Sequence, residues 1–236
     1  MPKVAIIAAL EREVLPTVKK WQRTERECDG RVFRFYENER AVLVCGGIGM
    51  GPARRACEAA IRLYHPGMAI SVGFAGSLSP KLRVGDYLAP ARVINVSDGT
   101  SIETGVGAGV LVSFDSIATI AQKAKLARAY AAEAVDMEAA GVARAAENHG
   151  IPFTAFKAIS DGHDFEFPAL ENFIATDGSF RTSDFVVGSL LRPGHWGKAV
   201  AMARNSARAS KTICSWLEQF NHVSGSPIGI RASAAF

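Results

Sequence analysis

Short, unbroken apolar runs alternate with amphipathic stretches along this chain. Such runs, bounded by turn residues, are typical of strands buried on both faces, whereas apolar positions at helical spacing are typical of helices. The predicted strands are 3–10, 31–38, 40–47, 68–76, 86–96, 108–114 and 151–160, with a hairpin formed by 31–38 and 40–47. The predicted helices begin near 13 and cover 52–65, 116–128, 137–148 and 195–220. The alternation predicts an α/β protein whose sheet is covered by helices on both faces.

The length and composition fit a single domain. The chain has 236 residues and a mass of 25.1 kDa, and 48% of its residues are hydrophobic, which is enough to build one full core. We predict a domain over 1–222. The last stretch, 223–236, reads "VSGSPIGIRASAAF" and is small, polar and rich in turn residues, so we expect a flexible C-terminal tail.

The charge pattern argues against nucleic-acid binding. The chain has 27 Lys and Arg against 23 Asp and Glu, a net charge of +4, and its basic residues are scattered. A surface that follows phosphates needs clustered positive charge, preferably with aromatic residues between. The uncharged stretch before Glu11 spans only 4–10, too short for a signal peptide or a membrane span. We therefore expect a cytoplasmic protein without an integral membrane segment.

The cysteines predict neither disulfides nor a metal site. There are four of them, without a CxxC motif or a nearby pair of histidines: Cys28, Cys45, Cys57 and Cys214. We expect reduced, mostly buried thiols and no bound metal.

Two glutamates directly follow the first predicted strand, where an α/β sheet collects its ligands. Glu11 and Glu13 flank Arg12. Alternate positions at a strand end would direct both glutamates to the same side. They also suit the first turn of a helix, whose dipole favours acidic side chains. Both interpretations stay open at this point.

Two further loops after predicted strands are rich in small residues. They contain Gly46, Gly47, Gly49 and Gly51 in the first, and Gly73, Ala75, Gly76 and Ser77 in the second. The first loop precedes a helix that begins at Pro52, so its backbone N–H groups could bind an anion or let a sugar approach closely. It matches neither a Walker loop nor a dinucleotide fingerprint. The second loop suits either close approach of a ligand or a simple tight turn.

Acidic residues also stand at two later strand ends. In "AVDMEAAGVARAA", Asp136 and Glu138 flank Met137 and have no Lys or Arg close in sequence. In "FKAISDGHD", Asp161 ends an apolar strand. A poorly solvated carboxyl group keeps its proton more readily and suits a general acid, although Asp is also a common helix N-cap. His163 could assist that acid or could be an ordinary surface residue.

Four segments at these strand ends resemble one known family. "AIIAALEREV", "GFAGSLSPKLRVGD", "AVDMEAAGVA" and "KAISD" are similar, in this order, to the purine nucleoside phosphorylase and 5′-methylthioadenosine/S-adenosylhomocysteine nucleosidase superfamily, over about residues 3 to 220. The resemblance implies a single-domain, three-layer α/β/α fold with a central mixed sheet. It implies cleavage of the N-glycosidic bond of a small nucleoside by water or phosphate, no cofactor except phosphate as a phosphorylase co-substrate, and a homo-oligomer, dimer or higher.

The resemblance assigns roles around the sugar and the base. Glu138 matches the glutamate that accepts hydrogen bonds from the ribose 2′ and 3′ hydroxyls, and Met137 matches the methionine beneath the sugar. Asp136 stands near the sugar, where many nucleosidases have Glu. Asp161 matches the acid that protonates or hydrogen-bonds purine N7, and Ser160 helps to orient it.

The same comparison assigns the nucleophile side of the site. Glu13 matches the glutamate that holds the attacking water, and Phe74 stands where nucleosidases usually have Ser. Ala75, Gly76 and Ile117 complete the predicted substrate-binding residues. These assignments fit the chemistry, because a departing purine develops negative charge while the ribose develops oxocarbenium character.

Hydrolysis is the favoured reaction. The segment 71–77 contains no arginine, and an acidic sequence follows the first strand, whereas a phosphorylase needs cations for its phosphate. Arg12, Arg54 and Arg55, together with the glycine loop, keep phosphorolysis as the alternative. A non-catalytic nucleoside-binding protein on the same scaffold is a further alternative, but it would need no acid at Asp161.

The C-terminal part suggests a particular branch of the family. The order of a "DG" turn, an apolar segment, "RPG" and an Arg/Ala-rich helix resembles the hopanoid-associated phosphorylase-like branch. That branch implies an adenosine with a bulky apolar 5′ substituent. Phenylalanines near this segment could line such a site or pack in the core: Phe165, Phe167, Phe173, Phe180 and Phe185.

Overall fold

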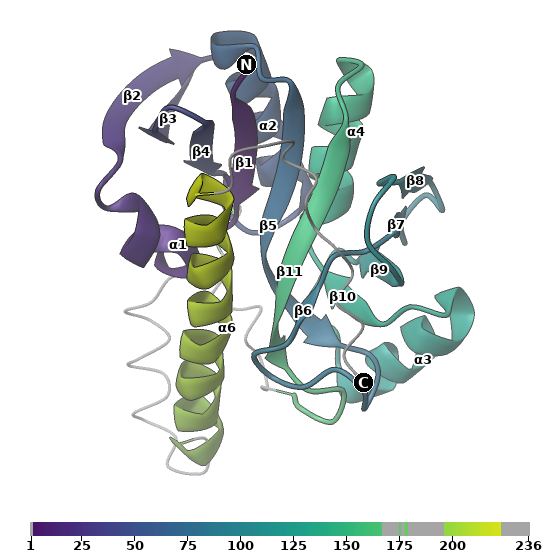
Figure 1. The fold of residues 1–236 in the computed structure, drawn as a ribbon. Helices are drawn as coiled ribbons and strands as arrows, with labels where there is room; N and C mark the ends of the chain where they lie inside the picture. Colours follow the sequence, from purple (N-terminus) through teal and green to yellow (C-terminus); the bar gives the residue numbers. More distant parts are fainter. Residues whose placement is uncertain (1, 167–174, 176–177, 179–195, 223–236) are drawn as a thin grey trace.

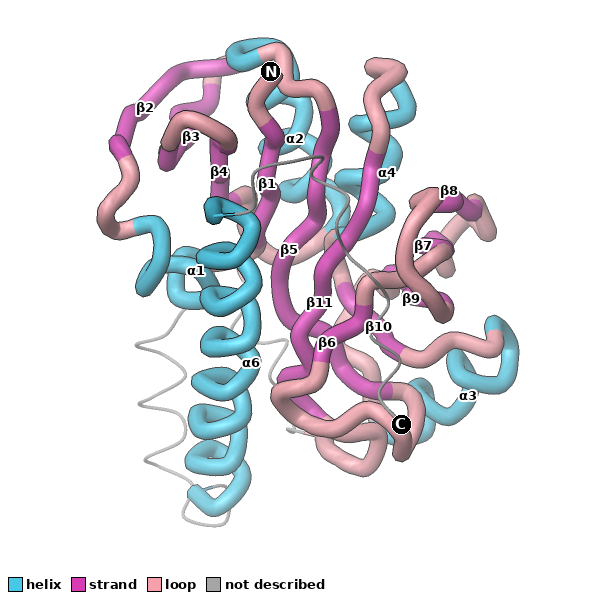
Figure 2. The backbone as a smooth tube through the Cα atoms, viewed as in Figure 1, coloured by secondary structure: helices cyan, strands magenta, loops and turns pink. Residues whose placement is uncertain are grey.

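The computed structural model describes residues 2–166, 175, 178 and 196–222 (Figures 1 and 2). Its strands are β1 (Val4–Ala8), β2 (Gln22–Cys28), β3 (Arg31–Glu37), β4 (Ala41–Cys45), β5 (Met68–Ser77), β6 (Tyr87–Leu88), β7 (Arg92–Asn95), β8 (Ser101–Glu103), β9 (Val110–Ser113), β10 (Ala134–Asp136) and β11 (Phe153–Asp161). Its helices are α1 (Glu11–Val18), α2 (Met50–Tyr64), α3 (Ile120–Tyr130), α4 (Ala139–Asn148) and α6 (Trp196–His222).

The strands of the described residues form one mixed sheet. Its main order is β2-β3-β4-β1-β5-β10-β9-β7-β8, and β11 pairs with β5 and β6. The central strand β5 runs parallel to β1 and β11 and antiparallel to β10. The carboxyl ends of β1, β5 and β11 therefore meet at one edge of the sheet, where the predicted site residues follow them.

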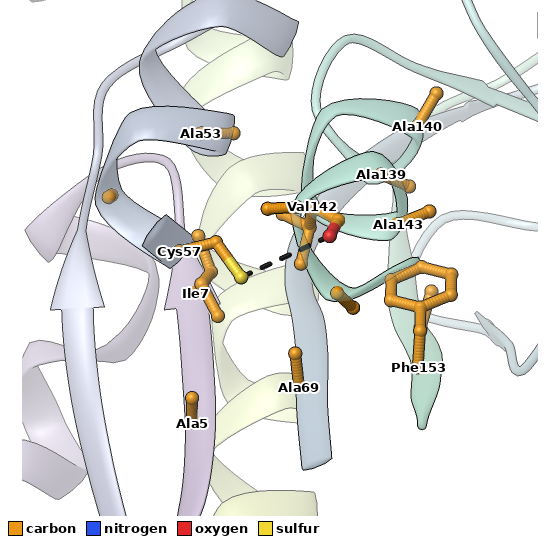
Figure 3. Packing of buried hydrophobic residues seen from close by; sticks show 14 of the residues in the cluster. Ala5, Ile7, Ala53, Cys57, Ala69, Ala139, Ala140, Val142, Ala143 and Phe153 are labelled. Atoms are coloured by element: carbon orange, nitrogen blue, oxygen red, sulfur yellow. Dashed lines mark hydrogen bonds between the residues drawn. The ribbon is translucent and has the colours of Figure 1, made fainter. Parts of the chain in front are cut away.

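Helices cover both faces of this sheet, which confirms the predicted three-layer α/β/α architecture. One core cluster joins α2 and α4 to the sheet, and a second joins α1 and α6 to its other face. Figure 3 shows Cys57 of α2 against Val142 of α4, with the thiol directed at the Val142 carbonyl. A Cβ at Gly141 would collide with the carbonyl of Met50, so the two helices need a glycine at their contact.

The apolar runs predicted the central strands well, and the peripheral strands less so. The hairpin of 31–38 and 40–47 is confirmed as the antiparallel pair β3 and β4. The single strand predicted over 86–96 is wrong, because it divides into β6 and β7 on either side of Pro90, which lacks an N–H for the ladder. β2 and β8 were not predicted, and the first helix begins at Glu11 instead of 13.

The remaining structural expectations concern thiols, metals and membranes. All four cysteines are free; Cys57 and Cys214 are buried, whereas Cys28 and Cys45 are only partly buried. Among the described residues, no cluster of His, Cys, Asp and Glu could hold a metal ion. None of the helices in this part of the chain is long and apolar enough to cross a membrane. The predicted tail, 223–236, lies outside the described residues.

Candidate active site

All ten sequence-predicted site residues line one cavity of about 180 Å³. They are Glu13, Phe74, Ala75, Gly76, Ile117, Asp136, Met137, Glu138, Ser160 and Asp161. They come from α1, β5, the segment before α3, the end of β10 and the turn that joins it to α4, and the end of β11. Residues that are up to 148 positions apart in sequence thus meet in one site, as their common location at strand ends predicts.

Glu13 is a buried carboxyl group in the first turn of α1. Its side chain accepts a hydrogen bond from the Leu10 N–H at 3.4 Å, so it caps the helix while it faces the cavity. A Cβ at Gly73 would lie 3.2 Å from Glu13 Oε2, so a side chain there would crowd the carboxyl group. Burial and then the negative charge of Glu138 raise the pKa of Glu13 to about 7, although Lys157 opposes the shift.

The two glutamates of α1 do not point the same way. Glu11 leaves the cavity and accepts hydrogen bonds from Arg34 at 2.7 Å and from Tyr36 at 2.9 Å. The expectation of a shared direction is wrong because both residues belong to a helix, where neighbours two positions apart diverge by roughly half a turn. The interpretation as the first turn of a helix is correct for both.

Asp136 holds the turn between β10 and α4 in place. Its Oδ1 accepts a hydrogen bond from Ser113 Oγ at 2.6 Å, and its Oδ2 accepts one from the Ala139 N–H at 2.8 Å. The Lys157 ammonium lies 2.8 Å from the same Oδ2. Both carboxylate oxygens are therefore engaged by protein groups, which makes Asp136 an anchor for its neighbours.

Glu138 is the anion that the glycine loop binds in this structure. Its Oε1 accepts a hydrogen bond from the Gly49 N–H at 3.0 Å, and its Oε2 accepts a longer one from Met137 at 3.3 Å. Gly49 precedes α2 with a φ of +105°, a conformation that favours glycine. Burial raises the pKa of Glu138 to about 7; Lys157 lowers it and Asp136 adds to the rise.

Lys157 supplies the cation that the sequence analysis missed beside Asp136 and Glu138. Its side chain is 0% exposed, and its Nζ is 3.9 Å from Glu138 Oε2 as well as close to Asp136. Burial alone would lower the pKa of Lys157, but the charges of Asp136 and Glu138 outweigh it, so the pKa is raised. The sequence contains a sign of this ion pair, because Lys157 is the only charged residue in the apolar strand predicted over 151–160.

Asp161 lies where the pairing of β11 with β5 is irregular. The register shifts between Ile159 and Asp161, as in a β-bulge, and this re-aims the side chains of Ser160 and Asp161. Ser160 Oγ donates a hydrogen bond to Asp161 Oδ1 at 2.7 Å. Among the described residues no helix starts at Asp161, so the alternative of an N-cap is wrong.

A second lysine missed by the sequence analysis contacts Asp161. Lys123 Nζ donates to Asp161 Oδ2 at 2.5 Å and forms an ion pair with it. Lys123 follows the capping box of Thr119 and Gln122 that starts α3. It stands three residues before the buried Leu126 on the inner stripe of the helix, a position where a lysine is unexpected.

Comparison with known proteins decides the family. The model of the phosphorylase superfamily matches residues 3–118 and 102–182. The chain belongs to the phosphorylase superfamily. This confirms the resemblance noted in the four strand-end segments.

Relatives in this superfamily include two nucleosidases. The chain is 27% identical over 201 residues to the 5′-methylthioadenosine/S-adenosylhomocysteine nucleosidase of Marinomonas sp., covering 68% of this chain and 86% of the relative. It is 25% identical over 205 residues to the aminodeoxyfutalosine nucleosidase of Campylobacter jejuni, covering 71% and 90%. The futalosine hydrolase structure from Helicobacter pylori shares the fold, with a TM-score of 0.68, 19% identity and coverage of 93% and 97%.

Several other candidates from the sequence lie away from this cavity. His163 is exposed and does not line the cavity. Arg54 pairs with Glu58 at 3.6 Å and lines a different cavity. Phe167, Phe173, Phe180 and Phe185 lie outside the described residues, whereas Phe165 is partly buried.

Proposed function

We propose that this member of the superfamily hydrolyses the N-glycosidic bond of a purine nucleoside that carries an adenine-type base. The nucleosidase relatives confirm the prediction of an enzyme that cleaves an N-glycosidic bond, and the adenine-type base is part of the proposal. The proposal for water as the nucleophile depends on one observation: the buried carboxyl group of Glu13 faces the same cavity as Glu138 and Asp161.

The cavity offers separate partners for the base and the sugar. Asp161 protonates N7 of the purine, so that the base departs as a neutral molecule when the bond from C1′ to N9 breaks. Glu138 accepts hydrogen bonds from the ribose 2′ and 3′ hydroxyls, and its negative charge stabilises the oxocarbenium character of the sugar. Met137 packs beneath the ribose ring. Each of these three residues lines the cavity.

Glu13 activates the attacking water. A group with a pKa of about 7 is well matched to proton transfer at neutral pH, because enough of it is ionised to accept a proton. Glu13 takes one proton from the water as the oxygen bonds to C1′. Lys157, close to Gly73 and thus to Glu13, keeps part of the carboxylate population charged.

The charges of the site favour water over phosphate. Glu13, Asp136 and Glu138 would repel a phosphate dianion, and the Lys157 charge between them is already paired. The Gly49 N–H, part of the predicted anion site, binds Glu138 instead. Arg54 and Arg55 do not line the cavity. Phosphorolysis remains the second candidate because Arg12 does line it.

A neighbouring cavity supports a bulky apolar 5′ substituent. This second cavity, of about 540 Å³, shares Arg12 and Phe74 with the first and is also lined by Pro16 and Ala207. A 5′ group that extends from the ribose past Phe74 could enter it. We therefore propose that substrates with an apolar 5′ group bind more tightly than adenosine itself.

A substrate panel tests the proposed function. The protein is incubated with adenosine, 5′-methylthioadenosine, S-adenosylhomocysteine, aminodeoxyfutalosine and a 5′-alkylthioadenosine of longer chain, each with and without phosphate. We expect release of free base without phosphate from at least one of them, measured by liquid chromatography. Release only with phosphate would establish the phosphorylase alternative, and release from none would contradict the proposal.

The pKa of Glu13 predicts opposite pH trends for activity and stability. Hydrolysis should rise with pH through a midpoint near 7, and Glu13→Gln should lower kcat by about a hundredfold or more. The pKa of Glu13 in the folded protein lies above its ordinary value of 4.5, so between pH 4.5 and 7 the folded state binds more protons than the unfolded state. As the pH rises through this range, wild type should therefore lose stability relative to Glu13→Gln. Rate profiles and denaturation at several pH values measure both trends. If the free energies of unfolding of wild type and Glu13→Gln changed in parallel with pH, the raised pKa of a buried Glu13 would be contradicted.

A further inference from the structure

Lys123 is a buried cation whose three N–H groups all have acceptors. Its side chain is 3% exposed. It donates to Asp161 Oδ2 at 2.5 Å, to the Gly162 carbonyl at 2.7 Å and to the Phe165 carbonyl at 3.0 Å. A lysine that only closed the loop after β11 would need the two carbonyls. The third contact directs one proton at the acid of the proposed reaction.

The two oxygens of Asp161 both accept hydrogen bonds from the protein. Ser160 engages Oδ1 and Lys123 engages Oδ2, and these are the side chains that contact the carboxyl group among the described residues. A carboxyl group between an ammonium and a hydroxyl is best satisfied as a carboxylate acceptor. The expectation of an isolated carboxyl that keeps its proton because it is poorly solvated is thus replaced by an ion pair. The proton for the purine needs a source.

We infer that Lys123 is this source: it is a positioning residue that passes a proton to N7 of the leaving purine through Asp161. The inference rests on the proposed function. In the step, an Nζ–H bond of Lys123 breaks and an O–H bond forms on Asp161; this O–H bond breaks as the N7–H bond forms. The electron pair of the bond from C1′ to N9 stays with the purine. Lys123 is left as a neutral amine and regains a proton from solvent after the products leave.

The burial of the pair gives this transfer a physical reason. Asp161 is 28% exposed towards the cavity while Lys123 is almost fully buried. A purine that fills the cavity removes the water next to Asp161, and two opposite charges are costly in such an environment. Movement of one proton from the ammonium to the carboxylate removes both charges at once. Substrate binding itself therefore favours the acidic form of Asp161.

The hydrogen-bond geometry suits both states of the pair. As an ammonium, Lys123 uses three N–H groups on three oxygens. As an amine, it keeps two N–H groups for the Gly162 and Phe165 carbonyls, and its lone pair faces Asp161. No side chain has to move. Strand β5 also packs closely against the pair at Gly76. A Cβ at this position would lie 2.8 Å from Asp161 Oδ2 and 3.3 Å from Lys123 Cε.

Two substitutions of Lys123 test the inference. Lys123→Met removes the ammonium, whereas Lys123→Arg keeps a positive charge and several N–H donors but does not release a proton. Lys125→Met, an exposed lysine on the same helix, is the matched control. With a purine nucleoside that wild type cleaves, we expect both Lys123 variants to lose about a hundredfold or more in kcat with KM changed less than about threefold. The control should match wild type.

A leaving group that needs no proton provides the second measurement. With p-nitrophenyl β-D-ribofuranoside, the departing nitrophenolate is stable as an anion, so the Lys123 variants should retain wild-type rates. A merely structural role would lower the rates of both substrates in parallel. If wild type does not cleave this probe, the inference is decided with the purine nucleoside, by whether the loss lies in kcat or in KM and by the activity of Lys123→Arg. If Lys123→Met does not fold, as judged by circular dichroism, Lys123→Arg carries the test.

Each of several results would overturn the inference: purine release by Lys123→Met within about threefold of wild type, a loss confined to KM, full activity of Lys123→Arg, or parallel losses on both substrates. Failure of the proposed function is a different result, since wild type would then release no base from any nucleoside of the panel.

Discussion

Asp161→Asn should lower base release from purine nucleosides by about a hundredfold to ten-thousandfold, the usual contribution of a general acid. Asn has nearly the same shape as Asp and can still accept a hydrogen bond from Lys123 through its carbonyl oxygen, but it cannot relay a proton. The fold should therefore remain, with an unchanged circular dichroism spectrum. Steady-state kinetics with the best substrate of the panel measure the effect.

Asp164→Asn is the control for this variant, because Asp164 is an exposed carboxylate three residues further along the same segment. It should keep wild-type activity. Near-normal turnover by Asp161→Asn would reject the acid, and an equal loss in both variants would point to a general change of the loop.

Lys157→Met should destabilise the folded protein by about 3–5 kcal/mol, the typical cost when one partner of a buried ion pair is removed. Lys157 is fully buried between Asp136 and Glu138, and its loss leaves their negative charges uncompensated in the core. The free energy of unfolding in urea measures this effect. Activity should fall too, because Glu138 and Glu13 would be protonated more readily without the cation.

A second substitution separates the charge effect from lost packing. In the Lys157→Met background, Asp136→Asn removes one of the uncompensated charges and should recover part of the lost stability. The exposed Lys125→Met should change stability by less than about 0.5 kcal/mol. A loss for Lys157→Met as small as that of Lys125→Met would contradict the buried ion pair.

The central layers of the fold could be predicted because burial leaves a clear pattern. β1, β5 and β11 are mostly apolar, are buried along most of their length and lie in the middle of the sheet. β2 lies at the edge, its residues are largely exposed and its sequence, QRTEREC, is mostly polar, so no apolar run marks it. A strand at the edge of a sheet is held by backbone hydrogen bonds to one neighbour and can be polar on both faces, so hydrophobicity does not reveal it.

The residues that line the site were predicted from the sequence, but the ion pairs between them were not. The ten residues were named through the family resemblance, and all of them line one cavity. The parallel strands β1, β5 and β11 end at the same side of the sheet, which brings Glu13 close to Ser160 and Asp161. Lys123 and Lys157 were missed because each pairs with a carboxylate more than 18 positions away in sequence. Only the tertiary structure brings these charges together. Both lysines nevertheless occupy apolar positions, and a charge at such a position indicates a buried partner.

The most direct test is a crystal structure of the protein with an uncleavable C-nucleoside analogue of adenosine. We expect the base N7 within hydrogen-bond distance of Asp161, the ribose 2′ and 3′ hydroxyls hydrogen-bonded to Glu138, and a water molecule between Glu13 and C1′. A nucleoside bound outside this cavity, or a ribose without contact to Glu138, would contradict it.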